Sequence, residues 1–322
     1  MQFNFECNIF FVMRKSFNQK FIAFFIFLIT LSSLYMESSK AGDVNYEGRE
    51  LKILSWNIYM LPHCNLFNGN RKRARIIAEK LFTSDYNIIV FEEAFDYRAR
   101  KIIKEKLQEK YPYIYGPANY SFFSFKTSSG IWILSTIPLA KIKEIEYKKS
   151  KGFDALARKG AVMYEGSWNG NEFQLVGTHL QADNPDEIRR EQCKQIAFTL
   201  LQQYAKPNVT QIVCGDFNIE KDDTLNYNYM LHVLNAENGT MEGNLNVSYD
   251  ELDNLLARKT NGKKQLIDYI LVRNSSFVNF IQRKIKIFRA YLGNKYIELS
   301  DHYAVEATVS FVPVIHLSSI LH

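Results

Sequence analysis

The sequence is poor in cysteine, proline and glycine, and each shortage excludes a class of protein. Its 322 residues include 4 Cys, 7 Pro and 15 Gly, while 47% are hydrophobic and 14% are aromatic. This composition excludes collagen-like, low-complexity and disordered chains, because there is enough apolar material to bury a core. Cys7 lies in the N-terminal leader described below, so Cys64, Cys193 and Cys214 allow at most one internal bridge. Stability must therefore come from the core rather than from a disulfide framework.

The excess of positive over negative charge is also small. The chain has 40 Lys+Arg against 34 Asp+Glu, a net charge of +6. A nucleic-acid-binding protein concentrates basic charge on one face, and this small excess neither shows nor excludes such a face. There is no internal repeat and no break in composition. The sequence therefore favours one large domain of mixed α/β type.

One long hydrophobic run is present, at residues 21–36 (FIAFFIFLITLSSLYM), between Arg14, Lys15 and Lys20 and the small residues at 38–42. A basic flank, an apolar run and a small-residue exit are typical of a secretory signal. The run is shorter than the ~20 residues of a spanning helix, but an uncleaved anchor stays open. We expect residues 1–41 to be a signal peptide or a membrane anchor. The product is then secreted, or membrane-anchored with residues 42–322 on the non-cytosolic side.

Asn-X-Ser/Thr triplets are more frequent than the roughly two or three expected by chance. Such triplets accept glycans in eukaryotic secreted proteins, so we predict a glycoprotein if the cell is eukaryotic. The triplets begin at Asn119, Asn208, Asn238, Asn246 and Asn274.

Short runs rich in Ile, Val and aromatic residues alternate with polar turns from residue 51 onward, which predicts strands. The expected strands are 51–58, 87–92, 130–135, 160–166, 172–180, 211–215, 266–272 and 303–311. Helices are expected at 97–110 and at 184–204, the second with Asn184 as its cap and Pro185 at its first position. Residues 220–264 are rich in Asn, Asp and Gly, and we expect long surface loops there.

Polar residues stand where several of the predicted strands end. Taken singly, each is compatible with a turn, a cap or a hydrogen-bonded structural role. Together they supply hard oxygen ligands suited to Mg²⁺, and the absence of Cys and of closely spaced His argues against zinc. Two His, several carboxylates and a hard metal ion fit the attack of water on a phosphodiester. The residues are Asn57, Glu92, Glu93, His179, Asp216, Asn218, Asp268, Asp301 and His302.

Six strings containing these residues occur in the order used by the endonuclease/exonuclease/phosphatase superfamily, to which DNase I belongs. The resemblance runs from about residue 50 to 311 and implies a four-layer α/β sandwich of two mostly antiparallel sheets flanked by helices. It also implies a catalytic domain at 42–311 and a C-terminal tail at 312–322. The strings are Trp56-Asn57, Phe91-Glu92-Glu93, Gly177-Thr178-His179, Gly215-Asp216-Phe217-Asn218, Ile267-Asp268-Tyr269 and Ser300-Asp301-His302.

Within this superfamily the chain is similar to the neutral sphingomyelinases C, particularly the secreted bacterial ones. The likeness lies in the strings at 57–61, 91–96, 177–182 and 300–308, and in a Gly-flanked loop at 151–160. By composition alone, that loop reads as a polar turn between strands. The resemblance implies a metal-dependent sphingomyelin phosphodiesterase that releases ceramide and phosphocholine at a bilayer surface. Its cofactor would be Mg²⁺, with Mn²⁺ or Co²⁺ as alternatives.

The resemblance also assigns a metal-binding centre and a general base. Glu93 aligns with the principal metal-binding carboxylate, Asn57 stands beside it and Asp301 completes the acidic centre. His302 aligns with the general base and Asp268 with the carboxylate that orients it. An imidazole with a pKa near 6.5 is suited to that task.

The remaining roles concern the substrate phosphate. His179 would polarise the phosphate or help the leaving oxygen depart. Asp216 and Asn218 would bind phosphate, attacking water or metal. Asp154 and Lys159 would position the 151–160 loop over the phosphate.

A lipid substrate requires an apolar surface near the site. The bacterial relatives carry an aromatic hairpin just before Ser-Asp-His, and residues 288–296 match it, with Gly293-Asn294 suited to a tight turn. Tyr291 and Leu292 are therefore predicted membrane contacts, although the relatives' adjacent Trp and Phe are not reproduced. An ordinary hairpin packed on the sheet is the alternative. A second candidate is 120–125 (YSFFSF), whose aromatics also fit a core strand of period two.

Two other functions stay open. A secreted nuclease of the DNase I type would need basic loops flanking the site, whereas residues 116–130 are aromatic with a single Lys126. We therefore expect the chain to act on membrane lipid without a nucleic-acid partner. We also expect it to be a monomer. Inositol-polyphosphate phosphatases carry a Trp-Cys-Asp-Arg string that this chain lacks.

A catalytically inactive membrane-binding module is disfavoured, because all the polar groups needed for catalysis are present.

Overall fold

The computed structural model describes residues 50–62, 69–182, 185–260, 262–273, 276, 278–292 and 295–312. All of these belong to one compact unit that spans residues 48–322. The predicted leader, Cys64, Asn184 and Asn274 lie outside the described residues. Within the described part of the chain, no helix is both long enough and apolar enough to cross a membrane.

The first of two large sheets has seven strands in the order β3-β4-β2-β1-β16-β13-β9. The β1–β2 and β9–β13 pairs are parallel, and the other four pairs are antiparallel. The strand bounds are β1 Glu50–Met60, β2 Ile88–Ala94, β3 Tyr113–Tyr115, β4 Trp132–Ser135, β9 Thr240–Glu242, β13 Val278–Lys286 and β16 Ala304–Phe311.

The second sheet has five strands in the order β12-β8-β7-β6-β5. Its β7–β8 pair is parallel and the rest are antiparallel. Two small hairpins, β10–β11 and β14–β15, stand apart from the large sheets. The bounds are β5 Ala140–Glu146, β6 Gly160–Trp168, β7 Asn171–His179, β8 Thr210–Asp216, β10 Tyr249–Asp250, β11 Lys264–Gln265, β12 Asp268–Arg273, β14 Arg289–Leu292 and β15 Lys295–Glu298.

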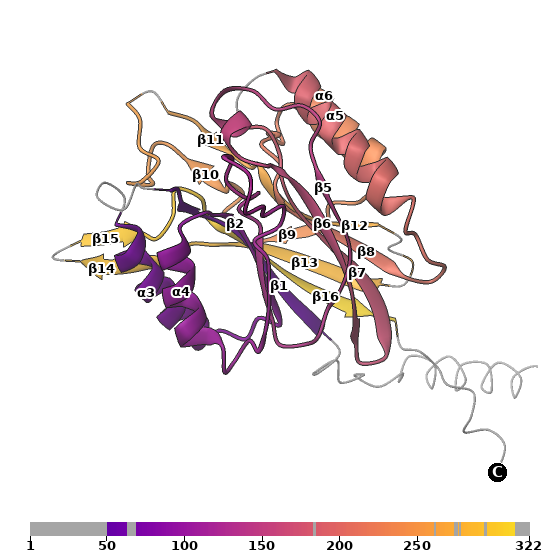
Figure 1. The fold of residues 1–322 in the computed structure, drawn as a ribbon, viewed down its shortest axis with the longest axis horizontal. Helices are drawn as coiled ribbons and strands as arrows, with labels where there is room; N and C mark the ends of the chain where they lie inside the picture. Colours follow the sequence, from indigo (N-terminus) through magenta and orange to yellow (C-terminus); the bar gives the residue numbers. More distant parts are fainter. Residues whose placement is uncertain are drawn as a thin grey trace, which may run out of the picture. The chain divides into compact units, whose positions relative to one another are not determined.

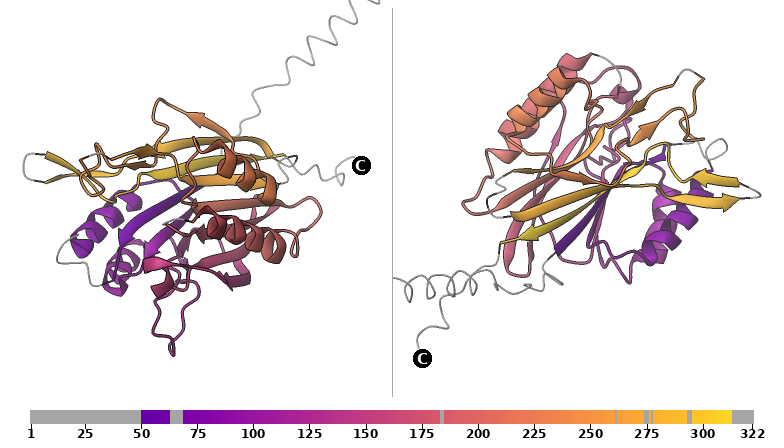
Figure 2. Two further views of the ribbon diagram at one scale, coloured as in Figure 1. Left: turned by 90° about the horizontal axis from the view of Figure 1, so that it is seen from above. Right: turned by 180° about the vertical axis from the view of Figure 1, so that it is seen from behind.

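Two pairs of helices cover the sheets on opposite sides of the molecule (Figures 1 and 2). Helices α3 (Asn70–Phe82) and α4 (Tyr97–Leu107) form one pair, and α5 (Asp186–Ile196) and α6 (Thr224–Leu234) form the other. A short 3₁₀ helix (Gly152–Leu156) precedes β6, and a π-helical turn (Ala197–Leu201) extends α5. This arrangement confirms the predicted four-layer α/β sandwich with mostly antiparallel sheets.

Strand β1 shows why the sequence forms layers. Its alternate residues Leu51 and Ile53 belong to the apolar cluster between the two sheets. Leu54 and Trp56 belong to the second cluster, which also contains the inward residues of α3 and α4. Because successive side chains of a strand point to opposite faces, a run that is apolar at nearly every position predicts a strand covered on both faces.

The predicted strands are all present, with small shifts at their ends, but several elements were not predicted. Helix α6 and strands β9 and β10 lie within 220–264, and β11 begins at Lys264, so the expectation of loops throughout that segment is wrong. Helix α3 and strand β13 carry buried arginines, Arg73 and Arg283, which interrupt the apolar pattern that marks such elements. Helix α5 begins at Asp186, with Pro185 at the N-cap position. Cys193 and Cys214 are buried free thiols.

Candidate active site

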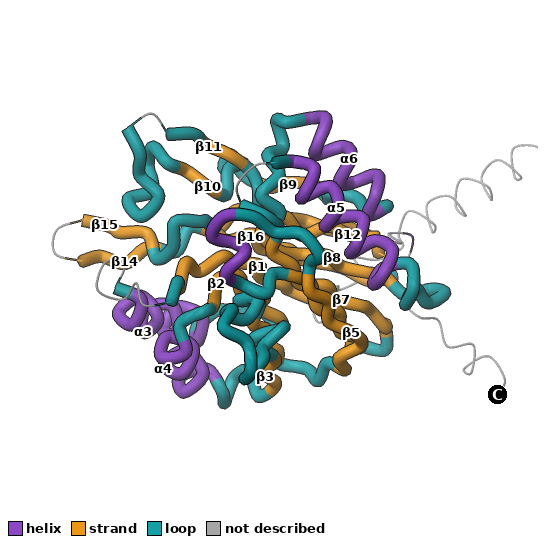
Figure 3. The backbone as a smooth tube through the Cα atoms, turned by 45° about the horizontal axis from the view of Figure 1, so that its top comes forward, coloured by secondary structure: helices purple, strands orange, loops and turns teal. Residues whose placement is uncertain are grey.

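The polar residues at the strand ends come together where the two sheets approach one another, and loops gather over the ends of β1 and β2 (Figure 3). Within the second sheet, Asp216 at the end of β8 lies opposite Asp268 in the antiparallel register. It also lies beside His179 of β7 in the parallel register. Strand pairing thus brings three of the predicted site residues of this sheet together.

Three hydrogen bonds fasten the first sheet and the 300–302 segment to this centre. Asn57 Nδ2 donates to Asp216 Oδ2 at 3.0 Å and so bridges the two sheets. Ser300 Oγ donates to the carbonyl oxygen of Asn57 at 2.6 Å. Trp56 Nε1 donates to the carbonyl oxygen of His302 at 3.0 Å. The backbone that carries His302 is therefore held by β1.

His302 forms a buried pair with Asp268. Its Nδ1 lies 2.9 Å from Asp268 Oδ2, and its Nε2 lies 3.8 Å from Asp216 Oδ2. Burial lowers the pKa of His302, but the carboxylates of Asp268 and Asp216 outweigh this effect and raise the pKa well above its usual value of 6.5. Ligand atoms of Asp216, Asp268 and His302 all lie within 4.8 Å of one another, so this trio is one group able to hold a metal ion.

Glu93 supplies a carboxylate with unused hydrogen-bonding capacity. Its Oε2 is buried and has no hydrogen-bond partner among the described residues, and its backbone has a positive φ of 53°. Burial and the negative charge of Asp301 raise its pKa to about 7, while Lys159 and His302 act in the opposite direction. An orphaned carboxylate oxygen among other buried acids is a fitting ligand for a divalent cation.

The other two predicted metal ligands are Asp301 and Asn57. Burial is the chief cause of the raised pKa of Asp301, and the negative charge of Asp301 in turn raises the pKa of Glu93. Asn57 turns its Nδ2 towards Asp216, and its Oδ1 accepts from the backbone N–H of Tyr59 at 3.1 Å. Burial and Asp268 raise the pKa of Asp216 to about 6. The oxygen-rich donors fit Mg²⁺ better than zinc.

His179 lies in a second group, around Lys159. The Lys159 side chain is only 3% exposed, and its Nζ lies 3.0 Å from His179 Nε2 and 2.7 Å from Asp154 Oδ1. Burial and the charge of Lys159 lower the pKa of His179 well below 6.5. His179 is therefore neutral at physiological pH, with Nε2 placed to accept a hydrogen bond from Lys159.

Asn218 sits between the two groups, with its backbone at a positive φ of 50°. Its backbone N–H donates to Asp216 Oδ1 at 2.9 Å, and its Nδ2 donates to the carbonyl oxygen of Leu180 at 3.3 Å. Lys159 donates to the same carbonyl oxygen at 2.8 Å. The predicted phosphate-binding residues are thus linked in one network.

Arg73 and Asn254 belong to the site's support and were not predicted. Arg73 donates to the carbonyl oxygens of Ile58 at 2.8 Å and Leu299 at 2.7 Å. Burial lowers its pKa to about 10, while Asp301 and Glu93 act against the shift. Asn254 Nδ2 donates to the carbonyl oxygens of Ser300 and Asp301, both at 2.9 Å. Because the two residues act on backbone carbonyls, no side-chain motif marks them.

The two predicted membrane segments differ in structure. In the β14–β15 hairpin, Tyr291 is 61% exposed, whereas the Leu292 side chain lies outside the described residues. The aromatic residues of 120–125 are exposed and belong to no strand. The alternative of a core strand there is therefore wrong.

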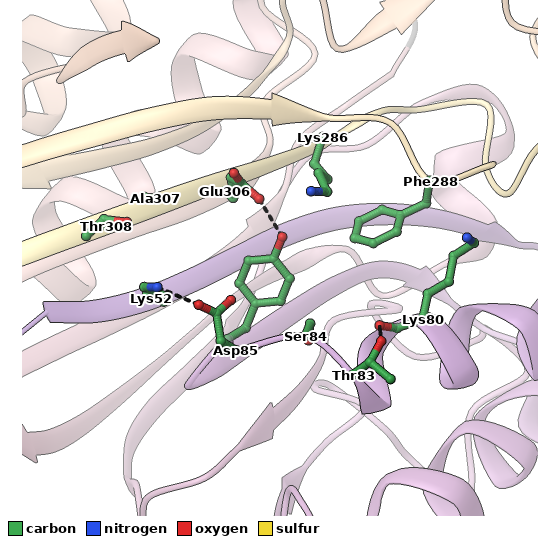
Figure 4. A pocket seen from close by; sticks show the side chains of 11 residues that line it. Lys52, Lys80, Thr83, Ser84, Asp85, Lys286, Phe288, Glu306, Ala307 and Thr308 are labelled. Carbon is green, nitrogen blue, oxygen red and sulfur yellow. Dashed lines mark hydrogen bonds and ion pairs between the residues drawn. The ribbon is translucent and has the colours of Figure 1, made fainter. Parts of the chain in front are cut away.

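A pocket of about 390 Å³ lies on another part of the surface, along β1 and β16, and includes Phe288 in its wall (Figure 4). Its acidic side chains are engaged: Asp85 pairs with Lys52, and Glu306 accepts from Tyr86 Oη. It contains none of the predicted site residues, and we assign it no part in the chemistry.

The chain belongs to the endonuclease/exonuclease/phosphatase family, whose model matches residues 54–302. It is 27% identical over 310 residues to a phospholipase C of Staphylococcus aureus, covering 87% of this chain and 93% of that protein. It is 26% identical over 324 residues to a sphingomyelinase C of Bacillus cereus, covering 88% and 96%. These matches confirm the resemblance seen in the sequence.

Solved structures agree with this assignment. The beta toxin of Staphylococcus aureus superposes with a TM-score of 0.72 at 26% identity, covering 80% of this chain and 99% of the toxin. A double mutant of the same toxin, with bound magnesium ions, superposes with a TM-score of 0.70 at 26% identity. The chain thus has the fold of the phosphoric diester hydrolases of this family.

Proposed function

We propose that this chain is a divalent-metal-dependent sphingomyelin phosphodiesterase that hydrolyses sphingomyelin to ceramide and phosphocholine. The observation that carries the proposal is the buried His302–Asp268 pair together with the unpartnered carboxylate oxygen of Glu93, whose pKa is lowered by the charge of His302. Relatives named sphingomyelinase C, which align over most of this chain, support the choice of substrate.

His302 would act as the general base through Nε2. Asp268 lies against Nδ1 and so favours the tautomer in which Nδ1 carries the proton. The free Nε2 then accepts a proton from the attacking water, and Asp268 stabilises the imidazolium that forms. A divalent cation held by Glu93, Asn57 and Asp301 would neutralise charge on the phosphate oxygens and offset the carboxylate charges that raise the pKa of His302.

His179 would polarise the phosphate rather than protonate the leaving oxygen. Its pKa lies well below 6.5, so it carries no second proton to give at neutral pH. With Lys159 donating to Nε2, the proton stays on Nδ1, which is buried and has no partner among the described residues. That N–H, together with Asp216 and Asn218, would position the phosphate. Asp154 would hold Lys159 in place.

We further propose that residues 1–41 direct export or anchor the chain and that residues 42–311 act as a monomeric catalytic domain. Mg²⁺ is the expected ion, with Mn²⁺ and Co²⁺ as substitutes. Exposed Asn208 and Asn246 are the better candidates for glycosylation. Asn119 is buried, and its Nδ2 donates to the carbonyl oxygens of Ile145 and Arg158.

A headgroup-release assay tests the function. Purified chain is incubated with sphingomyelin vesicles, phosphatidylcholine vesicles and plasmid DNA, each with Mg²⁺ or with EDTA. We expect phosphocholine release from sphingomyelin with Mg²⁺ and none with EDTA. Plasmid nicking without lipid cleavage would instead assign the nuclease alternative.

A further inference from the structure

Six exposed apolar side chains gather on two segments, which we call the aromatic face. One segment is the loop between β3 and β4, and the other is the 3₁₀ helix Gly152–Leu156. Single exposed apolar residues are normal, but a group of this size marks a contact surface. The exposed fractions are Tyr120 65%, Phe122 83%, Phe123 94%, Phe125 110%, Phe153 85% and Leu156 64%.

The two segments are held side by side by backbone hydrogen bonds. Thr127 N donates to the carbonyl oxygen of Leu156, and Arg158 N donates to the carbonyl oxygen of Thr127, both at 3.0 Å. At the base of the loop, Asn119 is 5% exposed, and its Nδ2 donates to the carbonyl oxygen of Arg158 at 3.0 Å. The exposed rings therefore stand on a fixed base, and the loop projects from the body of the molecule (Figure 2).

Both segments are attached to the candidate active site. At the end of the loop, the Gly130 carbonyl oxygen accepts from the backbone N–H of Ala94, next to Glu93, at 2.9 Å. In the 3₁₀ helix, Asp154 pairs with Lys159 at 2.7 Å, and Lys159 in turn contacts His179. The aromatic face thus lies at the rim of the site.

The charge around these rings is positive. In the stretches 116–130 and 147–160, the one acidic residue is Asp154, and it is paired with Lys159. Lys126 and Lys151 are exposed beside the rings. Aromatic rings flanked by lysines suit the headgroup layer of a bilayer, where rings enter among the lipids and ammonium groups meet phosphates.

We propose that the aromatic face inserts into the headgroup layer of a phospholipid bilayer and presents the active site to it, in preference to the β14–β15 hairpin. The inference rests on the proposed function, because a sphingomyelin phosphodiesterase must reach a bilayer lipid. The hairpin offers two exposed rings, Tyr291 and Tyr296, packed edge to face at 5.1 Å. The aromatic face offers more apolar surface and lies against the site.

The test separates binding from chemistry. The wild-type chain and a Phe122→Ser/Phe123→Ser/Phe125→Ser variant are co-sedimented with vesicles of sphingomyelin and phosphatidylcholine in EDTA, where hydrolysis does not intervene. We expect at least about tenfold weaker binding for the variant. Turnover of a short-chain sphingomyelin, monomeric in solution, should stay within about twofold of wild type. A Phe82→Ser/Phe198→Ser/Leu225→Ser variant, also exposed but outside the face, is the matched control and should bind normally.

A Phe123→Trp variant reports insertion directly, because its emission should shift to the blue when vesicles are added. The proposal would be overturned if wild type and the triple serine variant bound vesicles equally, or if wild type did not bind them. It would also be overturned if the emission of the Phe123→Trp variant did not shift. A wild-type dimer that the serine variant abolishes, without vesicle binding, would assign the face to a second copy and overturn it too. Binding that depends on the face without cleavage of any sphingomyelin would refute the proposed function and leave this inference standing.

Discussion

The catalytic centre and the aromatic face reverse the usual distribution of polar and apolar groups. At the centre, the carboxylates of Glu92, Asp216 and Asp268 are almost completely buried, whereas Phe123 in the loop between β3 and β4 is 94% exposed. Both arrangements are costly for an isolated protein, since buried charge loses hydration and exposed rings disturb water. The proposed function would offset both costs, with a cation bound at the centre and a lipid surface in contact with the face.

The largest effect should come from the centre. His302→Ala removes the proposed base and Glu93→Gln removes the unpartnered carboxylate, so each should lower turnover of both vesicular and monomeric sphingomyelin by about 10²–10⁴-fold. Steady-state kinetics measure the loss, and circular dichroism checks the fold. Turnover close to wild type in either variant would contradict the assigned roles.

The Asp154–Lys159 pair connects the two regions, and breaking it should have the next largest effect. Asp154→Asn leaves Lys159 buried without its carboxylate, which should cost about 2–4 kcal/mol of unfolding free energy. Both vesicle binding and turnover of the monomeric substrate should fall, because the pair holds the 3₁₀ helix and His179 together. Urea unfolding measures the first effect. Exposed Lys194, paired with Glu191, offers a control: Glu191→Gln should be nearly neutral.

The apo protein should become less stable as pH rises from about 4.5 to 7. Burial and Asp301 raise the pKa of Glu93 from 4.5 to about 7, so the unfolded chain loses this proton first and the folded state is penalised as pH rises. Glu93→Gln should remove this contribution, so its stability should fall less with pH than that of wild type. Urea unfolding in EDTA at several pH values measures both slopes. Equal slopes would show that Glu93 is not buried as an acid.

The same urea unfolding experiment can be repeated with added Mg²⁺ in place of EDTA. The ion should stabilise the wild type most at the upper end of this pH range, where Glu93 is ionised, and should stabilise Glu93→Gln less. Stabilisation of equal size in both proteins would place the ion away from Glu93.

The smallest effect should come from the hairpin. Tyr291→Ser/Tyr296→Ser should weaken vesicle binding by less than about threefold, because the hairpin has only two exposed rings among its described side chains, against six exposed apolar side chains on the aromatic face. Co-sedimentation beside the aromatic-face variant gives the comparison. A larger loss for the hairpin variant would reverse the ranking of the two surfaces.

Much of the fold could be predicted because it follows local patterns. The apolar run that forms β1 is recognisable from its residues alone, and Asp96 is a typical helix cap, accepting from the backbone N–H groups of Arg98 and Ala99. The apolar pattern did not predict an element where a buried charged residue stands in place of an apolar one. Arg73 in α3 is such a position, since its guanidinium is satisfied by carbonyl oxygens far away in the sequence.

The sequence by itself determined which chemical groups are present and the strands that carry them, because strand periodicity and strand-end polarity are local properties. Only the tertiary structure decided that Asn57 bridges to Asp216, that burial and the charge of Lys159 lower the pKa of His179, and that the rings of 120–125 are exposed. A run of alternating aromatics has the same local preferences in a core strand and in a surface loop. Whether such a run is buried or exposed depends on whether distant parts of the chain pack against it.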